Sequence, residues 1–335
     1  MFRRLSFFAA ANILLAVATS LAVATAEAQQ GAQAQSKWPQ RPVKIIVPYA
    51  AGGNTYGIAR VTSQALGETF GQSFVVENKV GGNGTVSAEF VARAPADGYT
   101  LLMVAQPVFA IVPAMIKAPY DPVADFTPIS IIGTNQFAFG LHKSVPANTL
   151  AEVIAYVKSK PSGSLNYSSG SIASVSHLVM ELLLVRAGIK VEHVPFKGGS
   201  LSLQSLVSGQ TPMGFNNVSE VIPSAKSGEI RLLAVSGSRR AAQLPDVPTV
   251  AESGFPGFNA QTWNGLVGPA KLPREIVDRV AAETRRRVKD PVFAQRMGGL
   301  GVDLLGTTPE EFAATIRADI PLWAEAVRIS GAKVD

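Results

Sequence analysis

The sequence predicts an α/β protein of two lobes hinged around a ligand cleft, and three observations support this fold class. The chain has 335 residues, which is enough for about two domains of roughly 100–200 residues each. Short apolar runs alternate with helical patterns, which is typical of mostly parallel sheets flanked by helices. The alternation pauses after residue 105 and begins again after residue 137. We therefore expect one sheet in each lobe.

The first run of alternation supplies the first lobe. Its apolar runs are short enough for buried strands, and turn-forming residues separate them from longer helical patterns. We expect strands over 43–49, 73–77 and 100–105 and helices over 55–70 and 86–94.

The second run of alternation repeats this organisation. We expect strands over 165–168, 191–195, 213–215 and 231–235 and helices over 150–159, 176–187, 200–208 and 219–227. One more strand over 262–267 and long helices over 273–289 and 309–330 close the chain.

Two segments are candidates for the connections between the lobes. An extended piece over 126–141 is ambiguous, and residues 244–256 are rich in proline and glycine. If both segments cross between the lobes, the last helices return to the first lobe. We therefore assign residues 38–136 and 258–335 to lobe 1 and residues 137–257 to lobe 2.

The N-terminus has the pattern of a cleavable signal peptide over 1–28, followed by a flexible Gln/Ala-rich tether over 29–37. Arg3 and Arg4 precede an apolar run, and Ala26-Glu27-Ala28 offers small residues for cleavage. The alternative is an uncleaved membrane anchor, since a run of about 20 apolar residues can span a bilayer. Because polar residues interrupt the run, we expect export, most simply to the periplasm.

The composition excludes several classes of site. The chain has no cysteine and three histidines, so disulfides, thiolate metal sites, catalytic thiols and a lipidated cysteine are ruled out and a histidine-rich metal centre is disfavoured. We expect no metal and no cofactor. Charged residues make up 16% of the chain and the net charge is +6, which suits small anions better than a nucleic acid.

The most informative loop, residues 48–55, lies between the first strand and the first helix. Gly52 and Gly53 let backbone N–H groups approach a ligand, and Asn54 or Thr55 can cap a helix whose N-terminus favours an anion. The alternative is a tight turn without a ligand. Neither this loop nor the glycines near residue 82 match the dinucleotide or P-loop patterns, so a nucleotide enzyme has little support.

Loops at the same strand-to-helix position in the second lobe carry uncharged polar groups. The hydroxyls of Ser169 and Ser174 and the amide of Asn216 can bind an anion, and Lys197 can neutralise one. The alternatives are helix caps for the serines and asparagine and a solvated lysine. The sequence contains no nucleophile-elbow motif and no obvious carboxylate to orient His177, so we expect a packed structural histidine rather than the base of a hydrolase.

Two further features have open interpretations. Trp263 either lines the cleft near the crossover or fills the core. The run Arg285-Arg286-Arg287 lies on a predicted amphipathic helix and favours a solvated face. One such run without interleaved aromatic residues does not predict nucleic-acid binding.

Taken together, the loops resemble those of the Bug family, the TctC-type solute-binding proteins of tripartite tricarboxylate transporters. The resemblance covers the chain from Trp38 to the last helix, and its motifs are Pro48-Tyr-Ala-Ala-Gly-Gly53, Val76-Glu-Asn-Lys79, Gly81-Gly-Asn-Gly84, Asp97-Gly-Tyr-Thr-Leu101, Tyr120-Asp-Pro122, Asn166-Tyr-Ser-Ser169, Ser174-Val-Ser-His177, Val194-Pro-Phe-Lys-Gly198 and Leu244-Pro-Asp-Val-Pro-Thr249. It implies a type II-like periplasmic binding protein fold, no catalysis, and delivery of an organic carboxylate to membrane permease subunits. In such proteins backbone groups and bridging waters of the first lobe hold the ligand carboxylate.

Two positions depart from the family pattern. The first family loop commonly continues to an aspartate, where this chain has Asn54-Thr55-Tyr56, and the family motif Phe-Asp-Asn is Phe215-Asn216-Asn217 here. Losing both acids favours a dicarboxylate or, with the ring of Tyr56, an aromatic carboxylate, for example adipate or terephthalate. The alternative is that both acids are structural, which leaves amino acids and citrate as ligands. The expected ligand-binding residues are Ala51, Gly52, Gly53, Asn54, Tyr56, Gln106, Ser169, Ser174, Lys197, Asn216 and Trp263.

Other functions remain as alternatives. A sensor subunit that signals to a membrane kinase would use the same cleft. A periplasmic hydrolase is disfavoured, because the chain shows no convincing catalytic set. We expect a monomer that binds no nucleic acid.

Overall fold

The structure is a computed structural model that describes residues 38–332. The residues from Pro42 onward form one compact unit, and the fold described below is that of this unit. The expected signal peptide and tether lie outside the described residues. Within residues 38–332, no helix has the length and apolar character that crossing a membrane requires.

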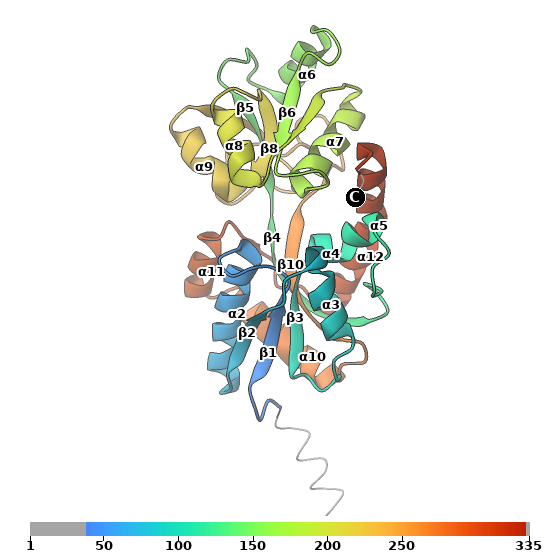
Figure 1. Cartoon of the computed structure of the whole chain (residues 1–335). Helices are drawn as coiled ribbons and strands as arrows, with labels where there is room; N and C mark the ends of the chain where they lie inside the picture. The colour runs from blue at the N-terminus through green and yellow to red at the C-terminus, as the bar shows by residue number, and fades with distance from the viewer. Residues whose placement is uncertain (1–37, 333–335) are drawn as a thin grey trace, which may run out of the picture. The chain divides into compact units, whose positions relative to one another are not determined.

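Lobe 1, as used below, is the part of the chain built around a six-stranded sheet (Figure 1). The strand order is β11-β4-β10-β3-β1-β2. The first three strands of the chain pair in parallel, whereas β10 is antiparallel to both of its neighbours. The strands are β1 (Val43–Val47), β2 (Phe74–Asn78), β3 (Thr100–Ala105), β4 (Phe126–Asn135), β10 (Thr262–Pro269) and β11 (Asp303–Leu304).

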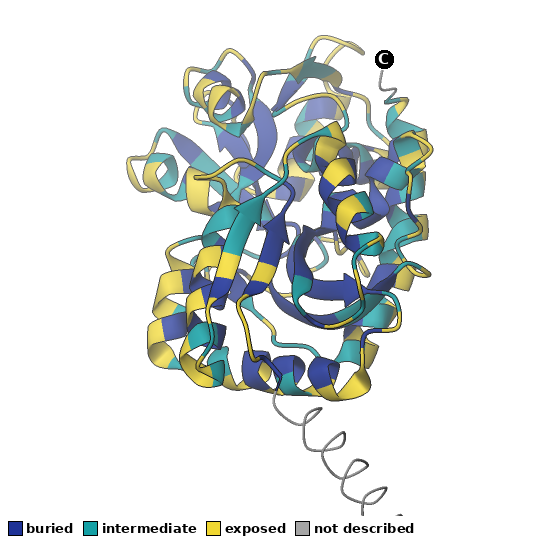
Figure 2. Cartoon of the chain, turned by 60° about the horizontal axis from the view of Figure 1, so that its bottom comes forward, coloured by how far each residue is buried: buried dark blue, intermediate teal, exposed yellow. Residues whose placement is uncertain are grey.

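Helices cover both faces of this sheet, and one of them, α12, continues to the second lobe. Figure 2 shows that most strand residues are buried while the helices turn exposed residues to solvent. The helices are α2 (Asn54–Phe70), the short turn η1 (Gly82–Gly84), α3 (Thr85–Ala92), α4 (Gln106–Ala110), α5 (Val112–Met115), α10 (Arg274–Arg287), α11 (Pro291–Gly298) and α12 (Pro309–Ser330).

Lobe 2 is built around a five-stranded sheet of order β7-β6-β8-β5-β9. The parallel strands β7, β6 and β8 are followed by β5 and β9, which pair antiparallel. The strands are β5 (Phe137–His142), β6 (Asn166–Ser169), β7 (Glu192–Pro195), β8 (Met213–Asn217) and β9 (Ile230–Val235), and the helices are α6 (Leu150–Lys158), α7 (Val175–Ala187), α8 (Gly199–Val207) and α9 (Val218–Lys226).

The two-lobed α/β fold that the sequence predicts is confirmed, and each expected strand and helix is present with its ends displaced by at most three residues. The ambiguous piece 126–141 is two strands, β4 and β5, which belong to different sheets. Sequence reasoning missed α4, α5, α11 and β11. These elements are short, and each of the three helices has a proline in its first turn, a residue that also reads as a turn signal.

A buried polar network holds the point where the chain crosses between the lobes. Gln136, 1% exposed, lies between β4 and β5. Its Nε2 donates to Asp303 Oδ2 at 2.9 Å, and its Oε1 accepts from Gly237 N at 3.2 Å. Asp303 Oδ1 also accepts from Ala242 N at 3.3 Å. Residues of both lobes therefore share hydrogen bonds at the hinge.

The last helix, α12, contributes to two hydrophobic cores. Phe312 and Ile316 pack in the core of lobe 1 with residues of β3 and β10. Trp323 and Val327 pack in the core of lobe 2, and α12 contacts α7. Pro321 lies inside the helix between these two parts. The expected lobe 1 includes the whole of 258–335, whereas Trp323, Ala326 and Val327 of α12 pack in the core of lobe 2.

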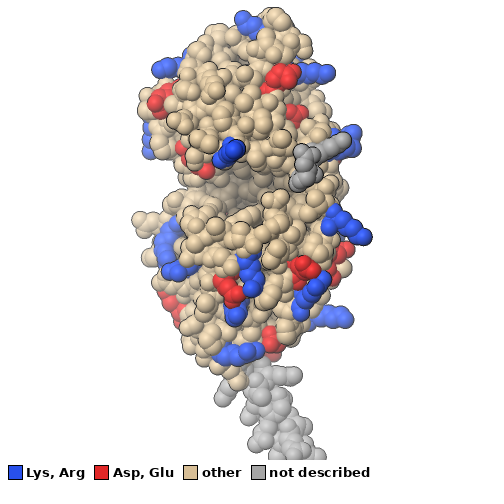
Figure 3. Space-filling view, viewed as in Figure 1, with Lys and Arg blue, Asp and Glu red and all other residues tan. Residues whose placement is uncertain are grey.

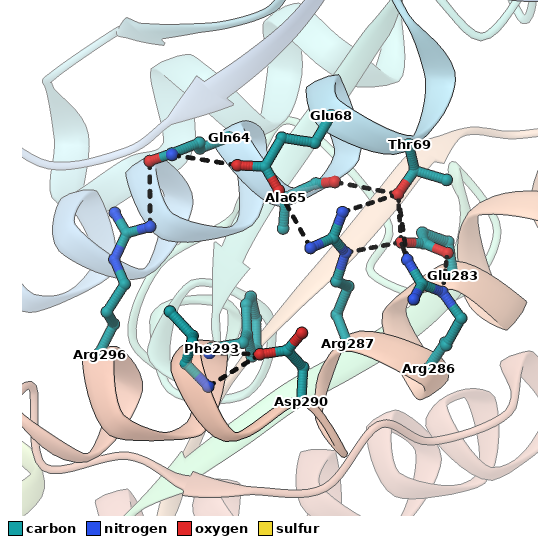
Figure 4. A network of polar contacts seen from close by, with 11 residues as sticks. Gln64, Ala65, Glu68, Thr69, Glu283, Arg286, Arg287, Asp290, Phe293 and Arg296 are labelled. Carbon is teal, nitrogen blue, oxygen red and sulfur yellow. Dashed lines mark hydrogen bonds and ion pairs between the residues drawn. The ribbon is translucent and has the colours of Figure 1, made fainter.

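An ion-pair network joins α2 to α10 (Figure 4). Glu283 is 7% exposed and accepts hydrogen bonds from Arg286 Nε at 2.8 Å and Arg287 Nε at 2.8 Å. Arg287 also pairs with Glu68 at 3.0 Å. The expectation of a solvated arginine run was wrong for Arg287, whose side chain is only 15% exposed, because it neutralises a buried carboxylate.

Candidate functional site

The strand register of lobe 1 places the loops after β1 and β3 beside the crossover. Asn264 of β10 pairs with Ala105 at the end of β3, and Thr262 pairs with Asn135 at the end of β4. Since β1 runs parallel to β3, the carboxyl ends of β1, β3 and β4 lie at the same edge. The chain leaves for lobe 2 directly after Asn135, so this edge faces the second lobe.

The strand register of lobe 2 likewise places the carboxyl ends of its parallel strands at the edge that faces lobe 1. Ala138, near the start of β5, pairs with Asn216, near the end of β8. Strands β6 and β7 run parallel to β8, so the carboxyl ends of all three lie at the edge where the chain enters this lobe. The loops of both sheets face one another there, and open α/β sheets bind ligands at the carboxyl ends of their strands.

The surface is hollowed between the two lobes, and the walls in view consist mostly of uncharged residues (Figure 3). A different groove of about 690 Å³ follows α2 and the first residues of β2, where it is lined by Arg60, Glu68 and Val75. That groove lies at the opposite end of the parallel strands from the loops described above. The candidate site is therefore the interlobe hollow.

In lobe 1, the loop after β1 presents the uncapped start of α2. Ala51, Gly52, Gly53 and Asn54 are exposed, and Gly52 has φ +90°, which glycine adopts without strain. Asn54 does not cap the helix, because its Nδ2 donates to Leu300 O at 2.7 Å. With no side-chain cap and no acid in the first turn, the first N–H groups of α2 are available to an anion.

A buried polar chain behind this loop was missed from the sequence. Thr55 Oγ1 donates to Asn264 Oδ1 at 2.8 Å, and Asn264 Nδ2 donates to Asn135 Oδ1 at 3.1 Å. Asn135 Nδ2 in turn donates to Gly301 O at 3.0 Å. This series of hydrogen bonds fixes the start of α2 to the first residues of β10 and the last residue of β4, so the loop has a rigid support. Tyr56, one residue further along α2, is partly buried.

Gln106 is the buried polar residue at the end of β3. It is 0% exposed, and neither Nε2 nor Oε1 has a hydrogen-bond partner within the described residues. A buried amide without partners costs about 1–3 kcal/mol per group. A ligand or a bound water at this edge of the sheet would satisfy it.

In lobe 2, the serine loop is largely occupied by its own hydrogen bonds. Ser174 caps α7 by accepting from His177 N at 3.4 Å, and it donates to Ser171 O at 2.8 Å. Ser169 is 0% exposed and bonds Ser171 O at 2.9 Å and His193 Nε2 at 2.7 Å. The capping interpretation therefore accounts for the geometry of Ser174.

Two stacked imidazoles support this loop from behind. The rings of His177 and His193 are 3.8 Å apart with an interplanar angle of 6°, and Ala173 N donates to His177 Nδ1 at 3.0 Å. Burial lowers the pKa of each histidine to about 4, and in His177 the neighbouring ring adds to the effect. His177 is thus the packed, neutral residue that the sequence predicts, and it positions the loop.

Asn216 and Lys197 occupy different environments at the same edge. Lys197 is exposed. Asn216 is 2% exposed, and its Nδ2 has no partner within the described residues. Ser202, at the start of α8, is 0% exposed with an unpartnered Oγ. Sequence reasoning missed Ser202, because a serine inside a helical pattern carries no signal of its burial.

Trp263 fills the core of lobe 1. It is 2% exposed and meets Phe312 edge-to-face, with ring centroids 5.0 Å apart. Its Nε1 donates to Asp319 Oδ2 at 2.7 Å. The structure therefore favours the core alternative for this residue. Within residues 38–332, no group of three histidine or acidic residues could hold a metal ion.

Comparison with known proteins shows the family to which this chain belongs. The chain matches the model of the tripartite tricarboxylate transporter family receptor, TctC, over residues 58–328. It belongs to this family, as the resemblance of the loops predicts.

Relatives and solved structures agree with this assignment. The chain is 30% identical to Protein BugT of Bordetella pertussis, over 89% of this chain and 91% of that protein. It is 31% identical to Rhodopseudomonas palustris MatC with bound malate, with a TM-score of 0.69 over 87% of this chain and 100% of that one. The structure of R. palustris Rpa4515 with adipate is likewise 31% identical, with a TM-score of 0.73 over 89% of this chain and 100% of that one.

Proposed function

We propose that this protein is an extracytoplasmic solute-binding protein that captures a small organic carboxylate in the interlobe cleft and delivers it to the permease of a tripartite tricarboxylate transporter. The expected export signal over 1–28 supports a periplasmic location. The observation that carries the proposal is a pair of buried amides, Gln106 and Asn216, one at the carboxyl edge of each sheet, with unpartnered atoms. Buried amides are normally hydrogen-bonded, so a ligand that enters the cleft gains these bonds.

The chemistry of the edge favours an anion. The uncapped start of α2 supplies N–H groups and partial positive charge, and the two amides add neutral donors. Solved relatives hold adipate and malate. Together with the missing acids at positions 54 to 56 and 216, this favours a dicarboxylate such as adipate or an aromatic carboxylate such as terephthalate. We propose binding without chemical conversion of the ligand.

A thermal-shift screen of the mature protein tests the ligand class. Adipate, malate, terephthalate, citrate and aspartate form the panel. A ligand at 100 times its Kd adds about 2.7 kcal/mol to the stability of the folded state, so a true ligand raises Tm clearly. A panel in which aspartate binds tighter than each dicarboxylate would contradict the charge argument, and a panel with no response would contradict carboxylate capture.

Two variants test the site. Gln106→Ala and Asn216→Ala should each weaken binding of the best carboxylate by about 1–3 kcal/mol, a factor of about 5–150 in Kd. Gln295→Ala, which removes an exposed amide on α11, is the matched control and should leave Kd unchanged. Isothermal titration calorimetry measures all three. Unchanged affinity in both site variants would place the ligand elsewhere.

Delivery to a permease needs a cellular test. Cells that carry the transporter but lack this protein should lose uptake of the labelled carboxylate and regain it when the protein is restored. Normal uptake in its absence, together with loss of a transcriptional response to the ligand, would favour the signalling alternative.

A further inference from the structure

The carboxyl group of Glu220 lies against the N-terminus of α8. A Cβ atom added to Gly199, the first residue of α8, would lie 2.9 Å from Glu220 Oε2 and 3.5 Å from Oε1. In this position the carboxyl group lies directly over the backbone of Gly199. Glu220 itself belongs to the first turn of α9, directly after β8. One carboxylate thus lies between two helix N-termini at the edge of lobe 2 that faces the cleft.

This position is at the contact between the lobes. Ser219, the preceding residue, is so close to Gly301 of lobe 1 that a Cβ atom on Gly301 would lie 2.6 Å from the Cβ of Ser219. Gly301 also accepts the hydrogen bond from Asn135 that supports the first-lobe loop. Glu220 therefore follows a residue that contacts lobe 1, at the edge of lobe 2 that faces the cleft.

The groups beside Glu220 are suited to a carboxylate. Within residues 38–332, the carboxyl group of Glu220 has no hydrogen bond or ion pair. Ser202, in the first turn of α8, and Asn216, at the end of β8, each have a buried polar atom without a partner. Ser168 Oγ donates to Ser202 O at 3.2 Å. Lobe 2 therefore combines a helix N-terminus with two unpartnered polar groups, and an acidic side chain of the protein already covers the helix end.

We propose that Glu220 is a specificity-determining residue of this cleft: its carboxyl group occupies the place of a second ligand carboxylate, so that a dicarboxylate binds together with one proton. This inference rests on the proposed function. Position 216 carries no acid in this chain, but Glu220 supplies one four residues later. The missing acid at position 216 therefore does not by itself make lobe 2 favourable to a second ligand carboxylate. A dianion meets like charge there unless Glu220 is neutral.

Few charges face Glu220 from the surrounding elements. Strand β8 and helix α8 contain no titratable residue, and residues 298–302 of lobe 1 contain none. The loop before α8 contributes Lys197, which is exposed, and α9 has Lys226 only in its last turn. Glu220 is itself exposed at this edge, and partial desolvation of its carboxyl group raises its pKa. A second carboxylate nearby would raise it further, which is the basis of proton uptake on binding.

A pair of ligands of equal chain length tests the proposal. Adipate carries two carboxylates and hexanoate one, and both stay ionised between about pH 6 and about pH 8. With the wild-type protein, the affinity for adipate should fall by up to about tenfold per pH unit over this range, whereas the affinity for hexanoate stays level. Glu220→Gln should bind adipate at least about tenfold tighter at pH 8 and remove the pH dependence. Glu192→Gln, an exposed acid of the same lobe, is the control.

Proton uptake and adipate affinity together distinguish a failure of the role of Glu220 from a failure of the proposed function. Calorimetry in buffers of different ionisation enthalpy should show about one proton taken up with adipate by the wild type and none by Glu220→Gln. Equal adipate affinity and equal pH profiles in both proteins overturn the role of Glu220 and leave the proposed function intact. Weaker adipate binding by Glu220→Gln overturns it as well, since the residue would then assist binding. If neither adipate nor malate binds the wild type, the proposed function fails for these ligands and the inference fails with it.

Discussion

Replacing Glu283 by glutamine should destabilise the junction of α2 and α10 in a pH-dependent way. The substitution preserves the size of the side chain and removes its charge. Glu283 is the centre of the network in Figure 4, where Arg286, Arg287 and Thr69 contact its carboxylate. Without that charge, Arg287 keeps only its ion pair with Glu68, which is 52% exposed, and loses the partner on its buried side.

The expected magnitude follows from the pKa of Glu283. Burial alone would raise this pKa, but the hydrogen bonds from Arg286, Thr69 and Arg287 outweigh it and lower the pKa to about 2. A lowered pKa in the folded state means that the carboxylate stabilises the protein fully above the unfolded value of 4.5 and loses this contribution as the pH falls toward about 2. The shift corresponds to roughly 3 kcal/mol. Since Arg286 is 61% exposed, solvent screening reduces the expected loss to about 1–3 kcal/mol at pH 7.

Urea unfolding of both proteins at about pH 7 and about pH 3 measures this effect. The difference in unfolding free energy between wild type and Glu283→Gln should be large at the higher pH and shrink at the lower one. Glu275→Gln, an exposed position on the same helix, should show little difference at either pH. An equal loss at both pH values would refute the electrostatic reasoning and indicate a packing defect.

Two further predictions concern α12. Burial raises the pKa of Asp319 to about 6, although a hydrogen bond from Trp263 acts in the opposite direction. Because the folded state then holds the proton more tightly than the unfolded state, the wild type should lose stability as the pH rises from about 4 through about 6. Asp319→Asn, whose amide oxygen can still accept the hydrogen bond from Trp263, should abolish this loss. Urea unfolding at about pH 4 and about pH 6 measures it, and an equal loss of unfolding free energy in the variant and the wild type would contradict the reasoning. Trp323→Ala should lower the unfolding free energy by about 3–5 kcal/mol, since Trp323 is 1% exposed in the core of lobe 2; a loss below about 1 kcal/mol would contradict that placement.

The strands and long helices were predictable because their hydrophobic periods are regular. The segment 126–141 was not, since β4 and β5 follow one another with only a short polar run over 134–136 between them, and only pairing with β10 and β8 decides which part belongs to which sheet. Helices α4 and α5 have five and four residues, too few for a period to emerge. Strand β11 has two residues and exists only through its pairing with β4.

The candidate site was predictable to the level of loops. The order of strands and helices places the loops after β1 and β3 at one edge of the first sheet and the loops after β6 and β8 at the facing edge of the second. Burial and pairing within those loops depend on tertiary contacts. Ser174 and Ser169 lie in the same serine-rich segment, but the first caps a helix and the second meets a histidine 24 positions away. Glu220 lies against Gly199, which belongs to a different helix.

The shared helix α12 has a practical consequence for dividing the protein. The strands of lobe 2 end at Val235, but Trp323, Ala326 and Val327 complete its core from the far end of the chain. A fragment that contains only residues 137–257 would expose an apolar face and should be prone to aggregation. A reporter attached after Ser330 would be joined to the half of α12 that packs on lobe 2, whereas the first half of the same helix packs on lobe 1. Fusions for ligand sensing should therefore treat the C-terminus as part of the second lobe.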